Sequence, residues 1–296
     1  MKILVTGANG MLGSDLCPIM REQHTVLATD IHELDVRDWS AVREAVHQFL
    51  PDVVIHLAAL TDVDFCERRP DEAFRTNTIG TQLVALACRE VGATIVYVST
   101  LSVFDGRKPT PYIEFDTPNP QSVYSQSKYQ GERAVQTLWS QHYITRAGWL
   151  FGGGTEDKKF VAKILDLAQT KPELKIVDDK FGSPTYTVDF ARGLQRLIET
   201  GLFGVYHLVN TQGGSSRYDV ARAILDEAGI TTCQLLPVSS AEFPLPAPRP
   251  RMEAGRNCQL ELLGFDWMRD WHAALRDYLH RLGEPVAAQG ELAATR

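Results

Sequence analysis

The most constraining stretch of the chain is "VTGANGMLGSDL", residues 5–16, which places Gly7, Gly10 and Gly13 in a G-x-x-G-x-x-G pattern. The apolar run "KILVT" before it predicts a strand, and the amphipathic segment after it predicts a helix. At such a turn the first glycine bends the chain, the second lets a phosphate approach the backbone, and the third lets helix and strand pack closely. A pyrophosphate would lie at the helix N-terminus, where free N–H groups attract anions. The pattern predicts a dinucleotide site, with a purely structural turn as the alternative.

Short apolar runs alternate with helix-length amphipathic segments through the first half of the chain. The runs predict strands over 2–6, 25–30, 52–58, 94–99 and 143–149, and the segments between them predict helices over 12–22, 39–50, 71–91 and 122–141. Strand, helix, strand at this spacing is typical of βαβ units. The strands are near-continuous Val, Ile and Leu runs, as expected where helices cover both faces of a parallel sheet. We therefore predict an α/β fold with a Rossmann-type doubly wound parallel sheet.

After Trp149 the alternation loosens, which indicates a smaller C-terminal substrate-binding lobe. Helices are expected over 158–170, 187–200, 216–228 and 267–282, and strands over 174–177 and 204–209. "PLPAPRPR" (244–251) is too rich in proline for helix or interior strand, so it predicts an extended loop, either a linker or a cover over a ligand. The predicted domains are a dinucleotide-binding domain over 1–150 joined by 185–210, a lobe formed by 151–184 and 211–282, and a frayed tail over 283–296.

Composition excludes several classes of function. The net charge is −7 and no block of Lys and Arg stands out, which argues against nucleic acid or a membrane surface as a partner. No apolar run approaches the roughly 20 residues of a membrane helix, and the apolar start "ILVTGANG" is too short for a signal-peptide core. The 5 cysteines are widely spaced and no CxxC or HxxxH occurs, so no disulfide framework and no metal site is predicted. A cytoplasmic enzyme is the expectation.

Asp30 ends the second predicted strand, where an acidic side chain can accept hydrogen bonds from the adenosine ribose. A carboxylate there would repel a 2′-phosphate, and no arginine follows it directly. Asp30 therefore favours NADH over NADPH as the cofactor, although His32 or a distant arginine could soften that preference. Ordinary strand-end capping is the alternative interpretation.

"YSQSK" places Tyr124 and Lys128 four residues apart, on one face of a predicted helix. An ammonium near a phenol favours the phenolate, so Lys128 is expected to lower the pKa of Tyr124 from about 10. The tyrosine could then exchange a proton near neutral pH. The motif alone is weak, but it follows the fourth strand of a chain that opens with a nucleotide loop.

Together, "TGANGMLG", "HLAA" (56–59), "YVST" (97–100) and "YSQSK" resemble an extended short-chain dehydrogenase/reductase. Further segments are similar to the dTDP-4-dehydrorhamnose reductase family: "TDVDFCE", "RTNTIGT", "VFDG", "RAGWLFG", "FGSPTYTVDFA", "GVYHLVN" and "RPR". The resemblance extends from residue 1 to about 282, nearly the whole chain.

The resemblance implies that Thr100, Tyr124 and Lys128 are the catalytic residues. Hydride would pass from the nicotinamide of NADH or NADPH to a sugar C4 carbonyl, and Tyr124 would protonate the developing alkoxide. Thr100 would donate a hydrogen bond to the same oxygen, and Lys128 would also hold the nicotinamide ribose. Ser99 is interpreted as strand-end packing, and Asn77 as either structural or part of a proton relay.

The resemblance also assigns the binding residues. The cofactor would contact the glycine turn, the adenine pair, the small residues after the third strand and the catalytic pair: Gly7, Gly10, Met11, Leu12, Gly13, Asp30, Asp35, Val36, Ala58, Ala59, Tyr124 and Lys128. The substrate would contact Thr61, Val63, Ser102, Trp149 and Arg249. Trp149 could instead be a core aromatic, and Arg249, whose guanidinium suits a diphosphate, could be a solvated loop charge.

The implied reaction is reduction of dTDP-4-dehydro-L-rhamnose to dTDP-L-rhamnose, or of a close relative. A nucleotide-sugar 4-epimerase remains open, as does a non-catalytic subunit like the β subunit of methionine adenosyltransferase. A dehydratase is disfavoured, because it needs acidic residues after the threonine, and Leu101 and Ser102 stand there. The reductase family usually has Asp-Tyr at these two positions, so we expect a differently shaped and less polar pocket wall. A homodimer is left open.

Overall fold

The computed structural model describes residues 1–154, 157, 159–265 and 267–283. A six-stranded sheet in the order β10-β5-β4-β3-β1-β2 forms its larger part, and every strand pairs in parallel with its neighbours. The strands are β1 (Lys2–Thr6), β2 (Thr25–Thr29), β3 (Val53–His56), β4 (Thr94–Thr100), β5 (His142–Ala147) and β10 (Gly204–His207). The predicted α/β fold with a doubly wound parallel sheet is confirmed.

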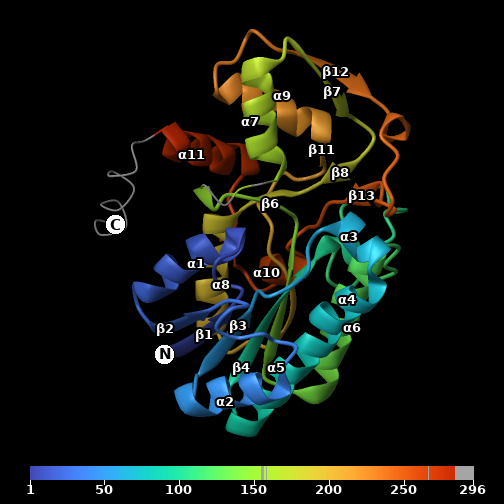
Figure 1. The fold of residues 1–296 in the computed structure, drawn as a ribbon. Helices are drawn as coiled ribbons and strands as arrows, with labels where there is room; N and C mark the ends of the chain where they lie inside the picture. The colour runs from blue at the N-terminus through green and yellow to red at the C-terminus, as the bar shows by residue number, and fades with distance from the viewer. Residues whose placement is uncertain (155–156, 158, 266, 284–296) are drawn as a thin grey trace.

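Helices cover both faces of the sheet, and the alternation along each strand decides which face a side chain reaches. In β1, Ile3 and Val5 pack toward α1 (Met11–Arg21) and α8 (Thr187–Glu199). Leu4 points the other way, into a core shared with α2 (Trp39–Phe49), α5 (Thr81–Val91) and α6 (Val123–Leu138). Figure 1 shows these two helical layers on either side of the strands. All three of these β1 side chains have no exposed surface, which explains the near-continuous apolar run.

The segment predicted as one helix over 71–91 is divided into three parts. It contains α4 (Pro70–Phe74), a π-helical turn η1 (Arg75–Gly80) and α5, and it is preceded by the short helix α3 (Val63–Arg68). Asn77 lies in the π turn and is fully buried. Its side chain bonds the backbone N–H and C=O of Leu60 at 2.8 and 3.0 Å and the Ser127 hydroxyl at 3.0 Å. Asn77 therefore ties the loop after β3 to α6, which is a structural role.

The smaller lobe combines three short sheets with three helices. The sheets pair β7 (Glu173–Val177) with β12 (Gln234–Val238), β8 (Phe181–Gly182) with β11 (Ser215–Ser216) and β13 (Met252–Glu253), and β6 (Trp149–Phe151) with β9 (Pro184–Tyr186). The helices are α7 (Phe160–Thr170), α9 (Arg217–Glu227) and α11 (Trp271–Gly283). Its core contains Phe151, Tyr186, Trp271 and Tyr278. Figure 1 shows this lobe above the large sheet.

Some segments late in the chain depart from the predicted organisation. Helix α11 begins at Trp271 and not at 267, because the Asp270 carboxylate accepts from the backbone N–H groups of His272 (2.7 Å) and Ala273 (3.4 Å) and so marks the helix start. Helix α10 (Cys258–Leu262) was not predicted, and it packs beside β10 with Leu260 in the core of the large sheet.

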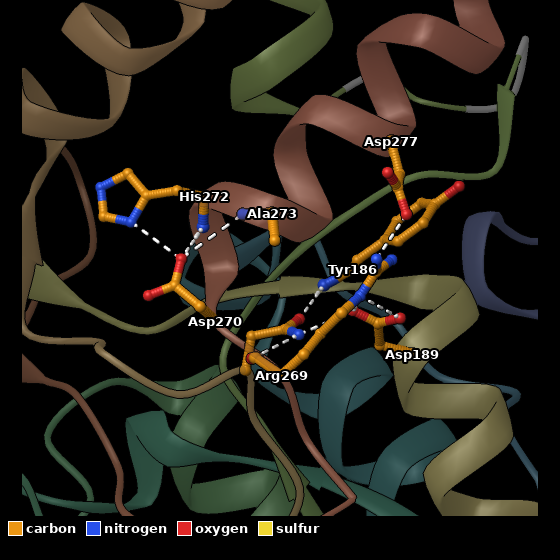
Figure 2. A network of polar contacts seen from close by, with 8 residues as sticks. Tyr186, Asp189, Arg269, Asp270, His272, Ala273 and Asp277 are labelled. Carbon is orange, nitrogen blue, oxygen red and sulfur yellow. Dashed lines mark hydrogen bonds and ion pairs between the residues drawn. The ribbon is translucent and has the colours of Figure 1, made fainter.

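A polar network joins the smaller lobe to the large sheet (Figure 2). The Asn210 side chain, fully buried, accepts from the Tyr186 N–H at 2.8 Å and donates to Asp189 at 2.7 Å. Arg269 donates to Asp189 at 2.9 Å and also contacts Asp277 of α11. These residues come from β9, α8, the segment after β10, the segment before α11 and α11 itself, so the network holds both parts of the molecule in one arrangement.

The proline-rich stretch 244–251 contains no helix or strand, as predicted. Its Ala247 N–H donates to Asp64 of α3 at 3.1 Å, so the stretch is anchored across to the large domain and is more than a linker. The predicted frayed tail over 283–296 lies outside the described residues except for Gly283, which ends α11. Among the helices of the described ranges, none has the length and apolar character needed to cross a membrane.

Candidate active site

The strand order reverses between β1 and β3, since β1 is followed in the chain by β2 on one side and β3 lies on the other. Ligands of open α/β sheets bind at such a point, beyond the carboxyl ends of the strands. A cavity of about 1090 Å³ opens there, bounded on its other side by the smaller lobe. The predicted site residues all line it: Gly7, Gly10, Met11, Leu12, Gly13, Asp30, Asp35, Val36, Ala58, Ala59, Thr61, Val63, Thr100, Ser102, Tyr124, Lys128, Trp149 and Arg249. Their individual roles stay predictions.

The glycine loop has the geometry that a bound pyrophosphate requires. Gly7 adopts a φ of +71°, and a Cβ there would lie 2.7 Å from the Ala58 nitrogen. A Cβ on Gly13 would lie 2.3 Å from the Ala8 carbonyl oxygen, so only glycine lets α1 pack this closely. Gly10 is the N-cap of α1, and no side chain caps the first N–H groups of the helix. These N–H groups are therefore available to an anion in the cavity.

Two acidic residues beside the glycine loop differ in their hydrogen-bond partners. Asp30 accepts from the Asn9 and Ile31 N–H groups at 2.9 and 2.8 Å, which holds its carboxylate at the cavity wall. Asp35 is held by Arg37 through three side-chain hydrogen bonds of 2.8, 3.0 and 2.6 Å, and this contact lowers the pKa of Asp35. Asp35 therefore presents a carboxylate that is already paired, whereas Asp30 presents one held by backbone N–H groups.

Tyr124 and Lys128 lie on one face of α6, which begins where Ser122 caps the Ser125 N–H. The Lys128 ammonium is buried, donates to the Val98 carbonyl at 2.8 Å and lies 4.2 Å from the centre of the Tyr97 ring. Burial lowers the pKa of Lys128 to about 7, although the nearby Glu132 carboxylate opposes that shift. Lys128 is thus held in the cavity wall by its hydrogen bond to the Val98 carbonyl.

The expected lowering of the Tyr124 pKa is wrong for this structure. Burial raises the pKa of Tyr124 well above its ordinary value, and a hydrogen bond with Thr100 only partly opposes the shift. Desolvation by burial is the largest effect on this phenol, and the nearby Cys66 and Glu253 raise its pKa further. The consequence is a phenol that stays protonated near neutral pH, which is the form that a proton donor needs.

Thr100 ends β4, where its side chain both caps the following turn and lines the cavity. Its hydroxyl oxygen accepts from the Ser102 N–H at 3.1 Å, which caps the 3-10 turn η2 (Leu101–Val103), and its hydroxyl donates to the Ser102 hydroxyl at 3.2 Å. Ser99 is more than strand-end packing, since it donates to the buried Glu132 carboxylate at 2.5 Å. Thr100 is therefore both a cap and a hydroxyl on the cavity wall.

The pocket wall at residues 101 and 102 differs from the expectation of a less polar surface. Leu101 does not line the cavity: it is 1% exposed and packs against Gly255, where an added Cβ would lie 2.7 Å from its side chain. Ser102 donates to the Glu253 carboxylate at 2.6 Å, and the Trp149 indole N–H donates to the other oxygen at 3.0 Å. A carboxylate therefore occupies this wall, which makes it polar and acidic.

Arg217 and Glu253 line the cavity and were not foreseen from the sequence. The Arg217 guanidinium lies 3.5 Å from the centre of the Trp149 ring, and burial lowers its pKa to about 10. No hydrogen bond or ion pair joins it to another residue of the described part of the chain. Neither residue belongs to a recognisable motif. Arg217 opens α9 and Glu253 ends the two-residue strand β13, both far along the chain from Thr100 and Tyr124, so no local signal marks them.

Arg249, predicted to face a diphosphate, forms an ion pair with Asp64 at 3.1 Å and donates to the Ala247 carbonyl at 2.9 Å. Thr61 and Val63 lie close to Asp64 in the chain, in the loop after β3 and at the start of α3. The proline-rich stretch and α3 therefore meet at the cavity mouth, with one arginine already partly neutralised.

Comparison with known proteins identifies relatives over the whole length of this chain. The model of the RmlD substrate-binding-domain family matches residues 1–284. A Mycobacterium tuberculosis protein named dTDP-4-dehydrorhamnose reductase is 38% identical over 301 aligned residues, which cover 100% of this chain and 98% of that protein.

Solved structures extend the likeness to three dimensions. A dTDP-4-dehydrorhamnose reductase from Clostridium acetobutylicum superposes with a TM-score of 0.92 at 40% identity, covering 96% of this chain and all of that one. A Bacillus anthracis dTDP-4-dehydrorhamnose reductase in complex with NADP superposes with a TM-score of 0.91 at 37% identity, covering 95% of this chain and 99% of that one. The family predicted from the motifs is confirmed: the chain belongs to the RmlD family, that of the dTDP-4-dehydrorhamnose reductases.

Proposed function

We propose that this protein uses NAD(P)H to reduce the C4 keto group of dTDP-4-dehydro-L-rhamnose or a closely related nucleotide sugar. One observation carries the proposal: Tyr124, Thr100 and Lys128 meet the glycine loop around a single cavity. The names of the relatives in Mycobacterium tuberculosis and Clostridium acetobutylicum support the substrate class, and the NADP complex from Bacillus anthracis supports the cofactor class.

The cofactor end of the cavity fits a dinucleotide. The N–H groups that open α1 would hold the pyrophosphate, Asp30 would accept from the adenosine ribose, and Lys128 would hold the nicotinamide ribose. A reduced nicotinamide bound there supplies the hydride. Ala58 and Ala59 keep the wall after β3 low, which leaves room for the dinucleotide beside the sheet.

At the reacting end, the residues of this chain handle the proton. The protonated Tyr124 phenol donates to the oxygen of the sugar C4 carbonyl as that oxygen gains negative charge. The Thr100 hydroxyl turns from Ser102 to the same oxygen and stabilises the charge in a site largely removed from water. The hydrogen bond of Lys128 to the Val98 carbonyl fixes its ammonium on the same side of the cavity as Tyr124 and Thr100.

The smaller lobe, predicted to contain 151–184 and 211–282, would hold the nucleotide sugar. Trp149 and Ser102 face the sugar, and Thr61 and Val63 complete that wall. Arg217 is better placed than Arg249 to meet a diphosphate, because Arg249 is already paired with Asp64. A guanidinium over an indole ring retains its charge and its donors for such an anion.

The proposal is tested by mixing the purified protein with dTDP-4-dehydro-L-rhamnose and each reduced nicotinamide cofactor and following nicotinamide absorbance. Stoichiometric loss of the reduced cofactor and formation of dTDP-L-rhamnose are expected. A 4-epimerase would give no net oxidation and would isomerise a 4-hydroxy sugar. A non-catalytic subunit would bind the cofactor and turn over no keto sugar, and either result would refute the proposal.

We further propose a preference for NADH, because the Asp30 carboxylate stands where a 2′-phosphate would bring further negative charge. Replacing Asp30 with Ala is expected to lower the ratio of kcat/KM for NADH to that for NADPH by about tenfold, or about 1.4 kcal/mol. Steady-state kinetics with both cofactors measures the ratio. Glu44→Gln on the exposed face of α2 is the matched control and should leave it unchanged. Equal kcat/KM values in the wild type would contradict this assignment.

A further inference from the structure

A chain of hydroxyl groups leads from the proposed proton donor to a carboxylate in the smaller lobe. Thr100 lies beside Tyr124 and lowers the pKa of its phenol, the Thr100 hydroxyl donates to Ser102 at 3.2 Å, and the Ser102 hydroxyl donates to Glu253 at 2.6 Å. Thr100 and Ser102 are adjacent through η2, whereas Glu253 comes from β13, about 150 residues later in the chain. All four side chains line the same cavity.

The order of donors gives this chain a direction. A carboxylate only accepts, so Ser102 must donate to Glu253, and Thr100 can then donate to Ser102. The Trp149 indole N–H fixes the second carboxylate oxygen at 3.0 Å, and the Arg217 guanidinium stands over the same indole ring. Glu253 is therefore held in place at the end of the chain, with a positive charge close by.

Lys128 offers no comparable path in this structure. Its ammonium donates to the Val98 carbonyl, and among the described residues no hydrogen bond joins it to another titratable side chain. Asn77, which could have extended such a path, is engaged with Leu60 and Ser127. The hydroxyl chain through Ser102 is thus the connection from Tyr124 to a titratable group that the described residues supply.

We propose that Ser102 and Glu253 form a relay that returns a proton to Tyr124 after each turnover, an inference that rests on the proposed reductase function. When the product leaves, the Tyr124 phenolate takes the Thr100 hydroxyl proton, Thr100 takes that of Ser102, and Ser102 takes a proton from the Glu253 carboxyl group. Glu253 is recharged by a hydronium ion from cavity water. One proton moves from water to the phenolate, and no bond to carbon changes.

The relay depends on the two residues that depart from the usual Asp-Tyr of the family. Leu101 turns into the core beside Gly255, and the small Ser102 leaves the room that the Glu253 side chain fills. Ser102 and Glu253 act through Thr100 and are positioning residues for the proton. Their removal should therefore slow the later turnovers more than the first, for which Tyr124 already carries its proton.

The test is stopped-flow oxidation of the reduced cofactor by excess keto sugar with Glu253→Gln, whose amide cannot deliver the proton. We expect a first turnover close to the wild-type rate, amounting to one cofactor per site, then turnovers slower by about tenfold or more. Ser102→Ala, which also removes a side chain from the proposed sugar wall, should slow the later turnovers more than the first. Ser102→Thr should restore the wild-type trace, and imidazole buffer should accelerate the slow phase of Glu253→Gln. Glu242→Gln, on an exposed ion pair with Lys175, is the control.

The outcomes separate the relay from the reaction that it serves. Equal slowing of the first and later turnovers in Glu253→Gln would show that Glu253 only shapes the pocket through Trp149, and would overturn the relay. Wild-type traces in both Glu253→Gln and Ser102→Ala would also overturn it. If the wild-type protein oxidises no cofactor with any keto sugar, the proposed function fails, independently of the relay.

Discussion

Replacing Tyr124 with Phe is expected to lower kcat by about 10²- to 10⁴-fold while leaving the fold and cofactor binding intact. The phenol is the group whose pKa burial raises, so near neutral pH it carries the proton that the developing alkoxide requires. Phenylalanine fills the same space beside Thr100 without supplying that proton. Steady-state kinetics gives kcat, and fluorescence titration with the reduced cofactor gives its Kd.

The matched control for this substitution is Tyr129→Phe, which removes a hydroxyl from the same helix outside the cavity lining. Its kcat should stay within about twofold of the wild-type value, since a proton donor acts only within hydrogen-bond reach of the reacting oxygen. Wild-type turnover in Tyr124→Phe would remove Tyr124 from the mechanism. An equal loss of cofactor affinity would show instead that the substitution disturbs the site as a whole.

Replacing Arg146 with Met is expected to destabilise the protein by about 3–5 kcal/mol. The Arg146 guanidinium and the Glu132 carboxylate lie 2.8 Å apart, with side chains only 4% and 1% exposed. The substitution leaves Glu132 buried with the Ser99 hydroxyl as its remaining polar partner. A buried carboxylate without its cation loses the attraction that offset its desolvation. Urea unfolding followed by circular dichroism measures the free energy of unfolding.

Two variants test whether burial of the charge is the cause. The double variant Glu132→Gln with Arg146→Met removes both charges and should recover part of the loss. Arg43→Met breaks the ion pair with Glu90, whose side chains are 52% and 34% exposed, and should cost at most about 1 kcal/mol. A similar loss in Arg43→Met and Arg146→Met would contradict the role given to burial.

The large sheet and the cofactor end of the cavity could be predicted because their determinants are local. A strand buried on both faces must be apolar throughout, so β1, β3 and β4 are recognisable as short runs. Gly7 and Gly13 must be glycine because backbone atoms lie within 3 Å of the position of a Cβ. Tyr124 and Lys128 face the same way because a helix brings residues four apart together.

The substrate end of the cavity could not be predicted in the same way. Sequence spacing says nothing about which residue meets Ser102 across the cavity, and the answer is Glu253, from a two-residue strand. Leu101 was expected to line the pocket, but its side chain is buried in the core, where only a glycine at position 255 leaves space for it. The expected pocket wall was less polar, whereas the folded chain places a carboxylate there.

Burial also reverses the expected pKa shift of Tyr124, the proposed proton donor. The spacing of Tyr124 and Lys128 suggested a phenol made more acidic by an ammonium, whereas burial raises its pKa. Desolvation depends on every atom packed around a group, which includes residues far apart in the sequence.

The sequence by itself determined the elements whose chemistry lies within one turn, strand or helix: the parallel sheet, the glycine loop and the Tyr124–Lys128 pair. Only the tertiary structure decided which distant side chains complete the site, namely Glu253 and Arg217, and which protonation state of Tyr124 burial favours. The physical reason is the distance along the sequence over which each kind of interaction acts. Backbone conformation and periodicity act over a few residues, whereas packing, desolvation and charge pairing act between any residues that the fold brings within a few ångströms.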